Sequence, residues 1–402
     1  MMETVSHFIT KNTTVYTVLL DATKAFDRVK FEKLFNILLD RGLNKAYVRL
    51  LLYMYSNQKL RVKWRDHYSD SFMVSNGVKQ GGVLFPVLFG VYIDSLLFEL
   101  KKSGYGCCVG PHFAGCLGYP DDLVLLSPTK KGLKHMLDIA DEFSKCFHVN
   151  FNGAKCQYVI FDRKHYWKRD TISIFGSDVN SQEYVIHLGH TLYADVTKHN
   201  VDGILCNFYK QFNMFRSKFK GISNSVQANL FSTYCTSFYG VALLPLCKLN
   251  AIHVAYRKSL RVVLNLPYRT HCGILNCMSN LLCEKHYFMR RFIKFAFNAL
   301  NHASDVIRYI FEQSVGSKQS VFYQNIEFCC KNLNVMYDIF NKSMYNCVKC
   351  VSLACSNFCK TEENHAKANI IKELKMCKTG HCNIMNLTIN DIDDIIYNVC
   401  VN

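Results

Sequence analysis

The stretch VYTVLLD, residues 15–21, determines how the rest of the chain is interpreted. Its β-branched and apolar residues predict a buried strand, and Asp21 places a carboxylate at the end of that strand. Residues 22–29, ATKAFDRV, then turn away, and the pattern from Phe31 to Arg41 predicts a helix. We therefore expect a buried strand at these residues that presents an acid at its tip.

A second acidic segment lies in residues 116–126, CLGYPDDLVLL. Two short apolar runs flank its acids and predict a β-hairpin with Asp121 and Asp122 at the tip. An Asp-Asp pair alone is usually a solvated turn, and a lone Asp at a strand end is usually a cap. Together, however, oxygen ligands at two strand tips are what a pair of Mg²⁺ ions needs for phosphoryl transfer.

A glycine-containing turn separates these two acidic segments. Residues 76–84, NGVKQGGVL, lead into an apolar stretch that predicts a helix ending near Leu100. Glycines without a Cβ would let the backbone of this turn approach a template or nucleotide closely.

Five segments, in this order, resemble the palm motifs of reverse transcriptases: residues 21–29, 76–86, 119–122, 151–155 and 187–189. The sequences DATKAFD and GVKQGGVL are most similar to those of enzymes from non-LTR retrotransposons (long interspersed elements), in the jockey-like, chicken-repeat-like branch. A weaker similarity continues through residues 265–271, NLPYRTH. The resemblance implies an RNA-directed DNA polymerase of a mobile element.

The resemblance also implies roles for charged residues. Asp21 and Asp121 would hold two Mg²⁺ ions, with Asp122 supporting the site, and these three are the expected catalytic and metal-binding acids. Lys155 would be a general acid for pyrophosphate, or else a solvated lysine. Asp27 is expected to be structural because it lies beyond the metal position.

The same comparison implies a nucleotide site and substrates. The ring of Phe26 would lie under the sugar of the incoming nucleotide, or else belong to the core. Gln80 and Gly81 would line the nucleotide and the templating base. The expected partners are an RNA template, a DNA primer and a dNTP.

Three features depart from the family pattern. Only twenty residues precede Asp21, so we expect the chain to be truncated at its N-terminus and to lack the fingers. Pro120 stands where this branch has Ala, and Pro cannot take the positive φ that two-residue hairpins often need. Phe85 stands where the family usually has Ser. We expect impaired polymerase activity, and the alternative is a catalytically inactive, nucleic-acid-binding remnant.

The formal net charge of +17 favours a polyanionic partner. Residues 205–283 contain no Asp or Glu, whereas nine Lys or Arg residues lie in this stretch. An ordinary solvated surface is the alternative explanation. We expect nucleic-acid contacts from the basic residues of this region: Lys218, Lys220, Arg257, Lys258 and Arg261.

The twenty cysteines favour free thiols or metal ligands rather than disulfides. Residues 347–382 contain several Cys and His, but their spacing matches no standard zinc finger, so Zn²⁺ is possible but disfavoured. The uneven distribution of the cysteines along the chain predicts a change from one structural module to another near residue 300. The expected domains are a palm (1–165), a primer-grip-like hairpin with a connection (166–200), a basic thumb (201–300) and a Cys-rich region (301–402).

The expected fold class is α+β. It comprises a right-hand polymerase palm, with an antiparallel sheet and helices on one face, followed by a helical thumb and a helical Cys-rich C-terminal region. The first ten residues lack the apolar core of a signal peptide, and the apolar run at residues 83–93 is too short to span a bilayer. We expect an intracellular protein, nuclear or cytoplasmic, without a membrane partner. The oligomeric state is not predicted.

Overall fold

The computed structural model describes residues 1–22, 26–78, 82–119, 122–163, 169–270, 272–279, 281 and 283–333. The chain divides into two compact units, Met1–Lys198 and His199–Asn402. The predicted domain boundaries, at residues 165, 200 and 300, stay predictions.

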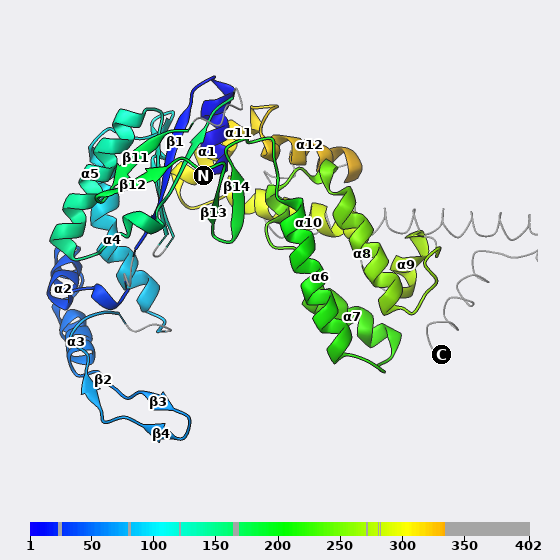
Figure 1. Cartoon of the computed structure of the whole chain (residues 1–402), viewed down its shortest axis with the longest axis horizontal. Coiled ribbons are helices and arrows are strands. Elements are labelled where there is room, and N and C mark those ends of the chain that lie inside the picture. The colour runs from blue at the N-terminus through cyan, green and yellow to red at the C-terminus, as the bar shows by residue number, and fades with distance from the viewer. Residues whose placement is uncertain are drawn as a thin grey trace, which may run out of the picture. The chain divides into compact units, whose positions relative to one another are not determined.

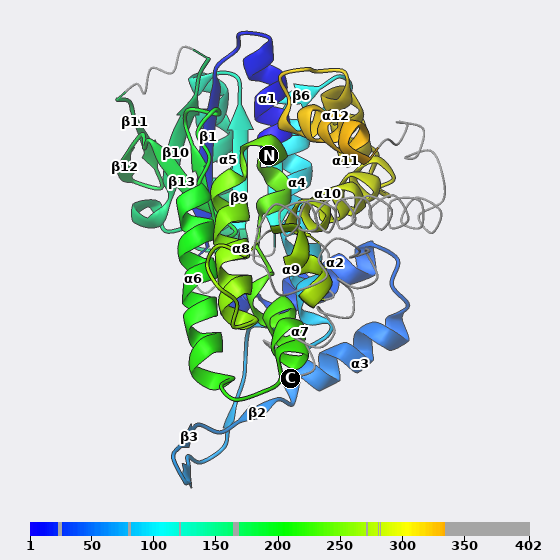
Figure 2. The same ribbon diagram turned by 90° about the vertical axis from the view of Figure 1, so that its right-hand side faces the viewer.

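A four-stranded antiparallel sheet forms the centre of the first unit. Its strands are β1 (Val15–Asp21), β8 (Cys116–Tyr119), β9 (Asp122–Ser127) and β10 (Gln157–Phe161), in the order β10-β1-β9-β8. Figure 2 labels three of these strands, β10, β1 and β9. The predicted buried strand and the predicted hairpin are both confirmed. The strand that carries Asp21 therefore lies in the interior of the sheet, between β10 and β9.

Helices pack on both faces of this sheet. Because side chains alternate along each strand, every strand can contribute to the core on either face. Val18 and Leu20 point into a core shared with α2 (Phe31–Asp40), α4 (Phe85–Lys102) and α5 (Lys130–Phe147). This is the helix-covered face that the sequence predicts. Leu19 belongs to the opposite core, where α1 (Met2–Thr10) contributes Val5 and Ile9, four residues apart on one helix face. The sequence analysis missed α1, although its apolar spacing is a usable signal.

The remaining elements of the first unit are short, apart from α3 (Lys45–Ser56). A hairpin ribbon formed by β2 to β5 extends beyond α3 (Figure 1). The other elements are η1 (Phe26–Arg28), β2 (Lys59–Leu60), β3 (Lys63–Trp64), β4 (His67–Tyr68), β5 (Phe72–Met73), β6 (Cys108–Val109), β7 (His112–Phe113), η2 (Gly153–Lys155), β11 (Thr171–Ile174), β12 (Ser177–Asn180), β13 (Tyr184–His187) and β14 (His190–Tyr193).

The described part of the second unit is helical. Its elements are α6 (Val201–Lys218), α7 (Asn224–Cys235), η3 (Val241–Leu243), η4 (Leu246–Lys248), α8 (Asn250–Val263), α9 (Cys272–Ser279), α10 (Glu284–Leu300), α11 (Asp305–Val315) and α12 (Val321–Leu333). Phe208, Phe231 and Phe288 lie in one core to which α12 also contributes. Helices on both sides of residue 300 therefore share a core.

The region predicted as a helical thumb is helical in the described residues. Helix α6 starts at Val201 because the Asn200 side chain accepts a hydrogen bond from the Gly203 amide, a standard N-cap. In the part of the chain that the structure describes, no helix is both long and apolar enough to cross a membrane.

Candidate active site

Two carboxylates meet at one end of the central sheet. Asp21 is the last residue of β1 and Asp122 is the first residue of β9, and the two are directly paired in the antiparallel register. Paired residues project from the same face of a sheet, so both carboxylates lie on the α1 side. The predicted acids Asp21 and Asp122 are thus brought together. Asp121 lies outside the described residues.

The turn between these strands contains two residues, because Tyr119 pairs with Asp122. Its residues, Pro120 and Asp121, lie outside the described part of the chain. Two-residue hairpins usually require a positive φ at their first position, which Pro cannot adopt. The predicted effect of Pro120 on the hairpin stays a prediction.

Lys155 approaches the site from η2. Its Nζ lies 4.0 Å from Oδ2 of Asp21, and both side chains remain largely accessible, at 65% and 45% respectively. The Asn152 amide donates to the Asp21 carbonyl at 2.9 Å, and Phe151 forms a β-bridge with Ala22. The fourth predicted motif is therefore held against the first by its backbone, and Lys155 is close to the carboxylate without being locked to it.

Close packing of Gly153 explains how η2 keeps this position. A Cβ at Gly153 would lie 2.3 Å from the carbonyl oxygen of Ile174 and 3.0 Å from Ser177. Any side chain there would displace η2 from the β11–β12 hairpin. Gly153 is therefore needed for the close contact between η2 and the β11–β12 hairpin.

The second predicted motif is joined to the first in the same manner. The Gly77 amide donates to the Val29 carbonyl, and the Val78 amide donates to the Phe26 carbonyl, both at 2.9 Å. Gly77 has a φ of +91°, and a Cβ there would lie 2.9 Å from Cα of Asp27. This glycine therefore allows the turn to approach the Asp27 backbone, whereas the sequence analysis assigned such glycines to template or nucleotide contact.

Phe26 is half-buried beneath this turn. Its ring meets that of Phe89 edge-on, with centroids 4.6 Å apart, and it packs against the core below the sheet. The Phe26 side chain thus packs against the core, and its predicted contact with the sugar of the nucleotide stays a prediction. Gln80 and Gly81 lie outside the described residues, and nothing is shown of the side chain of Phe85.

The fifth predicted motif forms a tight hairpin beside the carboxylates. Strands β13 and β14 are joined by Leu188 and Gly189, with φ values of +48° and +75°. Positive φ at both turn positions is typical of a type I′ turn, and it is strained for Leu188. The side-chain amide of Gln157 anchors the hairpin to β10, because it accepts from the Ile186 amide at 2.9 Å and donates to the Ile186 carbonyl at 3.4 Å.

His187 links this hairpin electrostatically to the site. Burial lowers the pKa of His187, and the negative charge of Asp122 opposes that shift. Burial also lowers the pKa of His190. Both imidazoles are therefore neutral at neutral pH and can offer hydrogen bonds beside the carboxylates without adding positive charge.

Outside this site, the predicted nucleic-acid-binding residues differ in exposure. Lys218 and Lys220 are exposed at the end of α6, and Lys258 is exposed on α8. Arg257 and Arg261 are instead held by internal contacts: Arg257 Nε donates to buried Glu284 at 2.6 Å, and Arg261 donates to the Thr270 carbonyl at 2.8 and 3.0 Å. Two of the five predicted cations therefore have a structural role.

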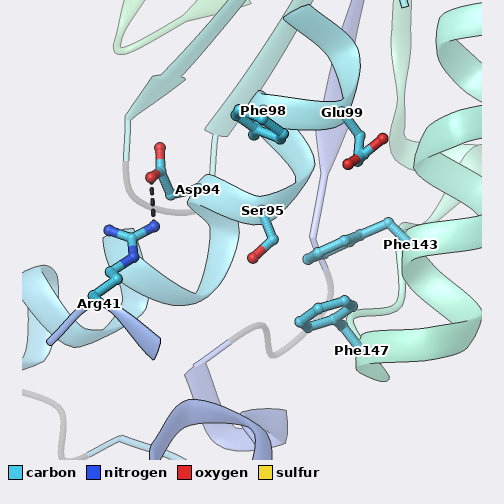
Figure 3. Close-up of a pocket in the computed structure, with 7 residues that line it drawn as sticks. All are labelled: Arg41, Asp94, Ser95, Phe98, Glu99, Phe143 and Phe147. Atoms are coloured by element: carbon cyan, nitrogen blue, oxygen red, sulfur yellow. Dashed lines mark hydrogen bonds and ion pairs between the residues drawn. The ribbon is translucent and has the colours of Figure 1, made fainter. Parts of the chain in front are cut away.

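A surface groove of about 410 Å³ lies between α4 and α5 (Figure 3). The stacked rings of Phe143 and Phe147 form one side, and the ion pair between Arg41 and Asp94 closes one end at 2.5 Å. None of the residues singled out by the sequence motifs lines it. The groove is therefore separate from the candidate site.

Carboxylate groups are the side chains of this site that could hold a metal ion. In the described residues, no group of three or more His, Cys, Asp or Glu side chains is arranged to hold a metal ion. Asp21 and Asp122 nevertheless offer the carboxylate oxygens that Mg²⁺ prefers, and the accessible Asp21 carboxylate has room for a ligand. The cysteines and histidines of residues 347–382, considered for Zn²⁺, lie outside the described residues.

Comparisons with known proteins agree with the motif order. Residues 2–192 match the family model described as reverse transcriptase (RNA-dependent DNA polymerase). The Pol polyprotein of the type-2 retrotransposable element R2DM of Drosophila melanogaster is 32% identical over 141 residues, 35% of this chain and 13% of that protein. The polyprotein of the type-1 retrotransposable element R2 of Nasonia vitripennis is 32% identical over 123 residues, 31% of this chain and 12% of that protein.

The match thus spans about an eighth of the length of these two relatives. Among solved structures, the apo telomerase of Candida tropicalis aligns with 98% of this chain and 55% of its own, at 12% identity and a TM-score of 0.40. The predicted non-LTR resemblance is confirmed. The jockey-like branch stays a prediction, because the relatives above come from R2 elements.

Proposed function

Because residues 2–192 are a reverse transcriptase domain related to those of non-LTR retrotransposons, we propose that this chain copies RNA into DNA with the acids at the tip of its central sheet. The observation that carries the proposal is the direct pairing of Asp21 with Asp122, beside Lys155. The described parts of the second and fourth motifs are bonded to the first, and the charge of Asp122 acts on His187 of the fifth, which supports a common site.

The proposed site residues retain the roles implied by the family. Asp21, Asp121 and Asp122 would hold two Mg²⁺ ions, which when bound would neutralise charge on the reacting phosphate. Phe26, Gln80 and Gly81 would contact the incoming dNTP. An RNA template and a DNA primer would be the other substrates, in an intracellular compartment, nuclear or cytoplasmic.

The reaction is an in-line displacement. The 3′-hydroxyl of the primer loses its proton to solvent and its oxygen bonds to the α-phosphorus of the dNTP, while the bond from that phosphorus to the bridging oxygen breaks and pyrophosphate leaves. Lys155 would donate a proton to the departing pyrophosphate, since its ammonium is accessible and lies 4.0 Å from Asp21. The β13–β14 hairpin, anchored by Gln157, would position the primer end.

Primer extension on an RNA template, with Mg²⁺ or Mn²⁺, tests this proposal. Asp21→Asn should lower the extension rate roughly 10³-fold, because a metal-binding carboxylate is worth several kcal/mol of transition-state stabilisation. Lys155→Ala should lower it about 10²-fold, the lower end for a general acid. Asp138→Asn changes an exposed acid on α5 and should have no effect.

Mn²⁺ binding, followed by electron paramagnetic resonance, separates the two functional candidates. Loss of both extension and Mn²⁺ binding in Asp21→Asn supports the polymerase. Mn²⁺ binding that depends on Asp21, in a parent chain that cannot extend a primer, supports the inactive remnant. Extension unaffected by Asp21→Asn would contradict the assignment of this site.

A further inference from the structure

The hairpin ribbon, residues 59–73, has an unusual surface for a soluble protein. In the segment KLRVKWR, residues 59–65, a basic residue alternates with an apolar one. Every residue of the ribbon is exposed, including Trp64 at 74% and Tyr68 at 62%. The ribbon therefore covers no core of its own unit.

The strand register sorts these side chains onto two sides. Lys63 is paired with Tyr68, and its Nζ lies 5.5 Å from the centre of the Tyr68 ring. Trp64 is paired with His67, and Leu60 is paired with Phe72. Paired residues project from the same side of a ribbon and adjacent residues from opposite sides, so Lys63 and Tyr68 lie on one surface and Trp64 and His67 on the other.

The cations of this ribbon are not neutralised within the protein. No carboxylate of the described residues forms an ion pair with Lys59, Arg61, Lys63 or Arg65. A two-stranded ribbon is only marginally stable in water, and its exposed apolar residues have a free-energy cost. Both facts favour a binding partner that is anionic and also has flat apolar groups.

We propose that this ribbon binds single-stranded nucleic acid, with its cations on the phosphates, Tyr68 stacked on a base at the surface of Lys63, and Trp64 stacked on a base at the opposite surface. Phosphates match the unpaired cations, and only unpaired bases offer their faces to aromatic rings. A protein partner fits less well, because lysine is depleted in the core of protein interfaces. The proposal does not depend on polymerase activity and involves none of the residues assigned to the catalytic site.

Fluorescence anisotropy with labelled single-stranded RNA, single-stranded DNA and a duplex of the same sequence tests the cations. The variant Lys59→Gln, Arg61→Gln, Lys63→Gln, Arg65→Gln should reduce the slope of log affinity against log salt by at most about three, since each single-strand phosphate contact contributes about 0.7. A control with Lys101, Lys102, Lys131 and Lys134 changed to Gln removes as many exposed charges from α4 and α5. It should leave the slope unchanged.

Intrinsic fluorescence tests the stacking independently of folding. Trp167→Phe leaves Trp64 as the only tryptophan, since the chain contains two. Its emission should be quenched by a single strand, and Trp64→Ala should weaken binding about 5- to 150-fold, the range for one lost base stack. Unequal binding of RNA and DNA would identify the natural strand.

Three outcomes would overturn the proposal. One is a salt slope that is the same in the ribbon variant as in the parent. Another is an equal loss of slope in the lysine control. The third is duplex binding as tight as single-strand binding with unchanged Trp64 emission. Loss of primer extension in Asp21→Asn with intact binding by the ribbon would leave this proposal standing.

Discussion

Two basic segments of this chain look alike in sequence and differ in what their cations contact. In residues 59–65, four cations lie on an exposed ribbon without carboxylate partners. On α8, Arg257 is bonded to buried Glu284 and Arg261 to the Thr270 carbonyl. The first segment has charge available for a ligand, and the second uses most of its charge to hold helices together.

The α8 segment shows that cations close together on a helix can have partners inside the protein. Its cations are three or four residues apart, which places them near one another on a helix and suggested phosphate contacts. Burial opposes the charge of Arg257, but the ion pair with Glu284 outweighs it and raises the pKa of the guanidinium. The acid-free stretch ends at residue 283, and the acid that binds Arg257 is the next residue, Glu284. The composition of the stretch therefore gives no sign of this ion pair.

The largest expected effect on this contrast comes from Glu284→Ala. The carboxylate is 6% accessible and holds Arg257, so its removal leaves a partly buried cation without a carboxylate partner. We expect a loss of about 3 kcal/mol of unfolding free energy, the lower end for breaking a buried pair. Urea denaturation followed by circular dichroism measures it.

The matched control is Glu327→Ala, which breaks a pair with Lys331 on the exposed side of α12. The side chains of that pair are 46% and 72% accessible, so the loss should stay within about 0.5 kcal/mol. Equal destabilisation by both variants would remove the distinction between structural and exposed charges.

A second prediction concerns pH and His253, which lies beside the same acid. Burial lowers the pKa of His253 to about 4, although Glu284 opposes the shift. The imidazole is then neutral at neutral pH, so its contact of 3.6 Å with Glu284 is not an ion pair under those conditions. At that distance it is also too long for a hydrogen bond.

The direction of the pH dependence follows from this depressed pKa. Below pH 6.5 His253 becomes protonated in the unfolded chain, whereas in the folded chain it stays neutral until the pH falls to about 4. Stability is therefore complete above pH 6.5 and falls by about 2 to 3 kcal/mol as the pH drops to 4. Urea denaturation of His253→Gln across this range should show a shallower decline than the parent. Identical slopes would contradict the assignment.

Local patterns were sufficient to predict much of the palm. The strand ending in Asp21 and the hairpin around residues 116–126 were expected from alternation and turn residues, and both are confirmed. The pairing of Asp21 with Asp122 is a long-range register, which the family resemblance implied and periodicity alone did not.

Other parts of the site depend on contacts that spacing does not reveal. The need for glycine at Gly77 and Gly153 comes from backbone atoms of distant segments, Asp27 and Ile174. The exposure of the ribbon at residues 59–65 likewise depends on tertiary packing, since an alternating pattern usually predicts a half-buried strand. The alternating basic residues of this segment are a usable signal in the sequence.

The smallest expected effects are those of substitutions at Lys258 and Arg261 on α8, which should differ in nucleic-acid binding and in stability. Lys258 is exposed, and its nearest aromatic contact is the Tyr268 ring at 5.9 Å, so it can still reach a phosphate. Lys258→Gln should therefore reduce the salt slope for single-stranded RNA by about 0.7, one phosphate contact. Its unfolding free energy should change by less than about 0.5 kcal/mol.

Arg261→Gln should behave in the opposite way. Its guanidinium donates twice to the Thr270 carbonyl and once to Cys272 Sγ, at 3.2 Å, so its loss should cost about 1 kcal/mol of unfolding free energy. The salt slope should stay that of the parent, because those bonds already occupy the group that a phosphate would need. A flatter slope at unchanged stability would show that Arg261 leaves its internal contacts to bind the ligand. The α8 segment would then resemble the ribbon after all, and its spacing would have predicted binding correctly.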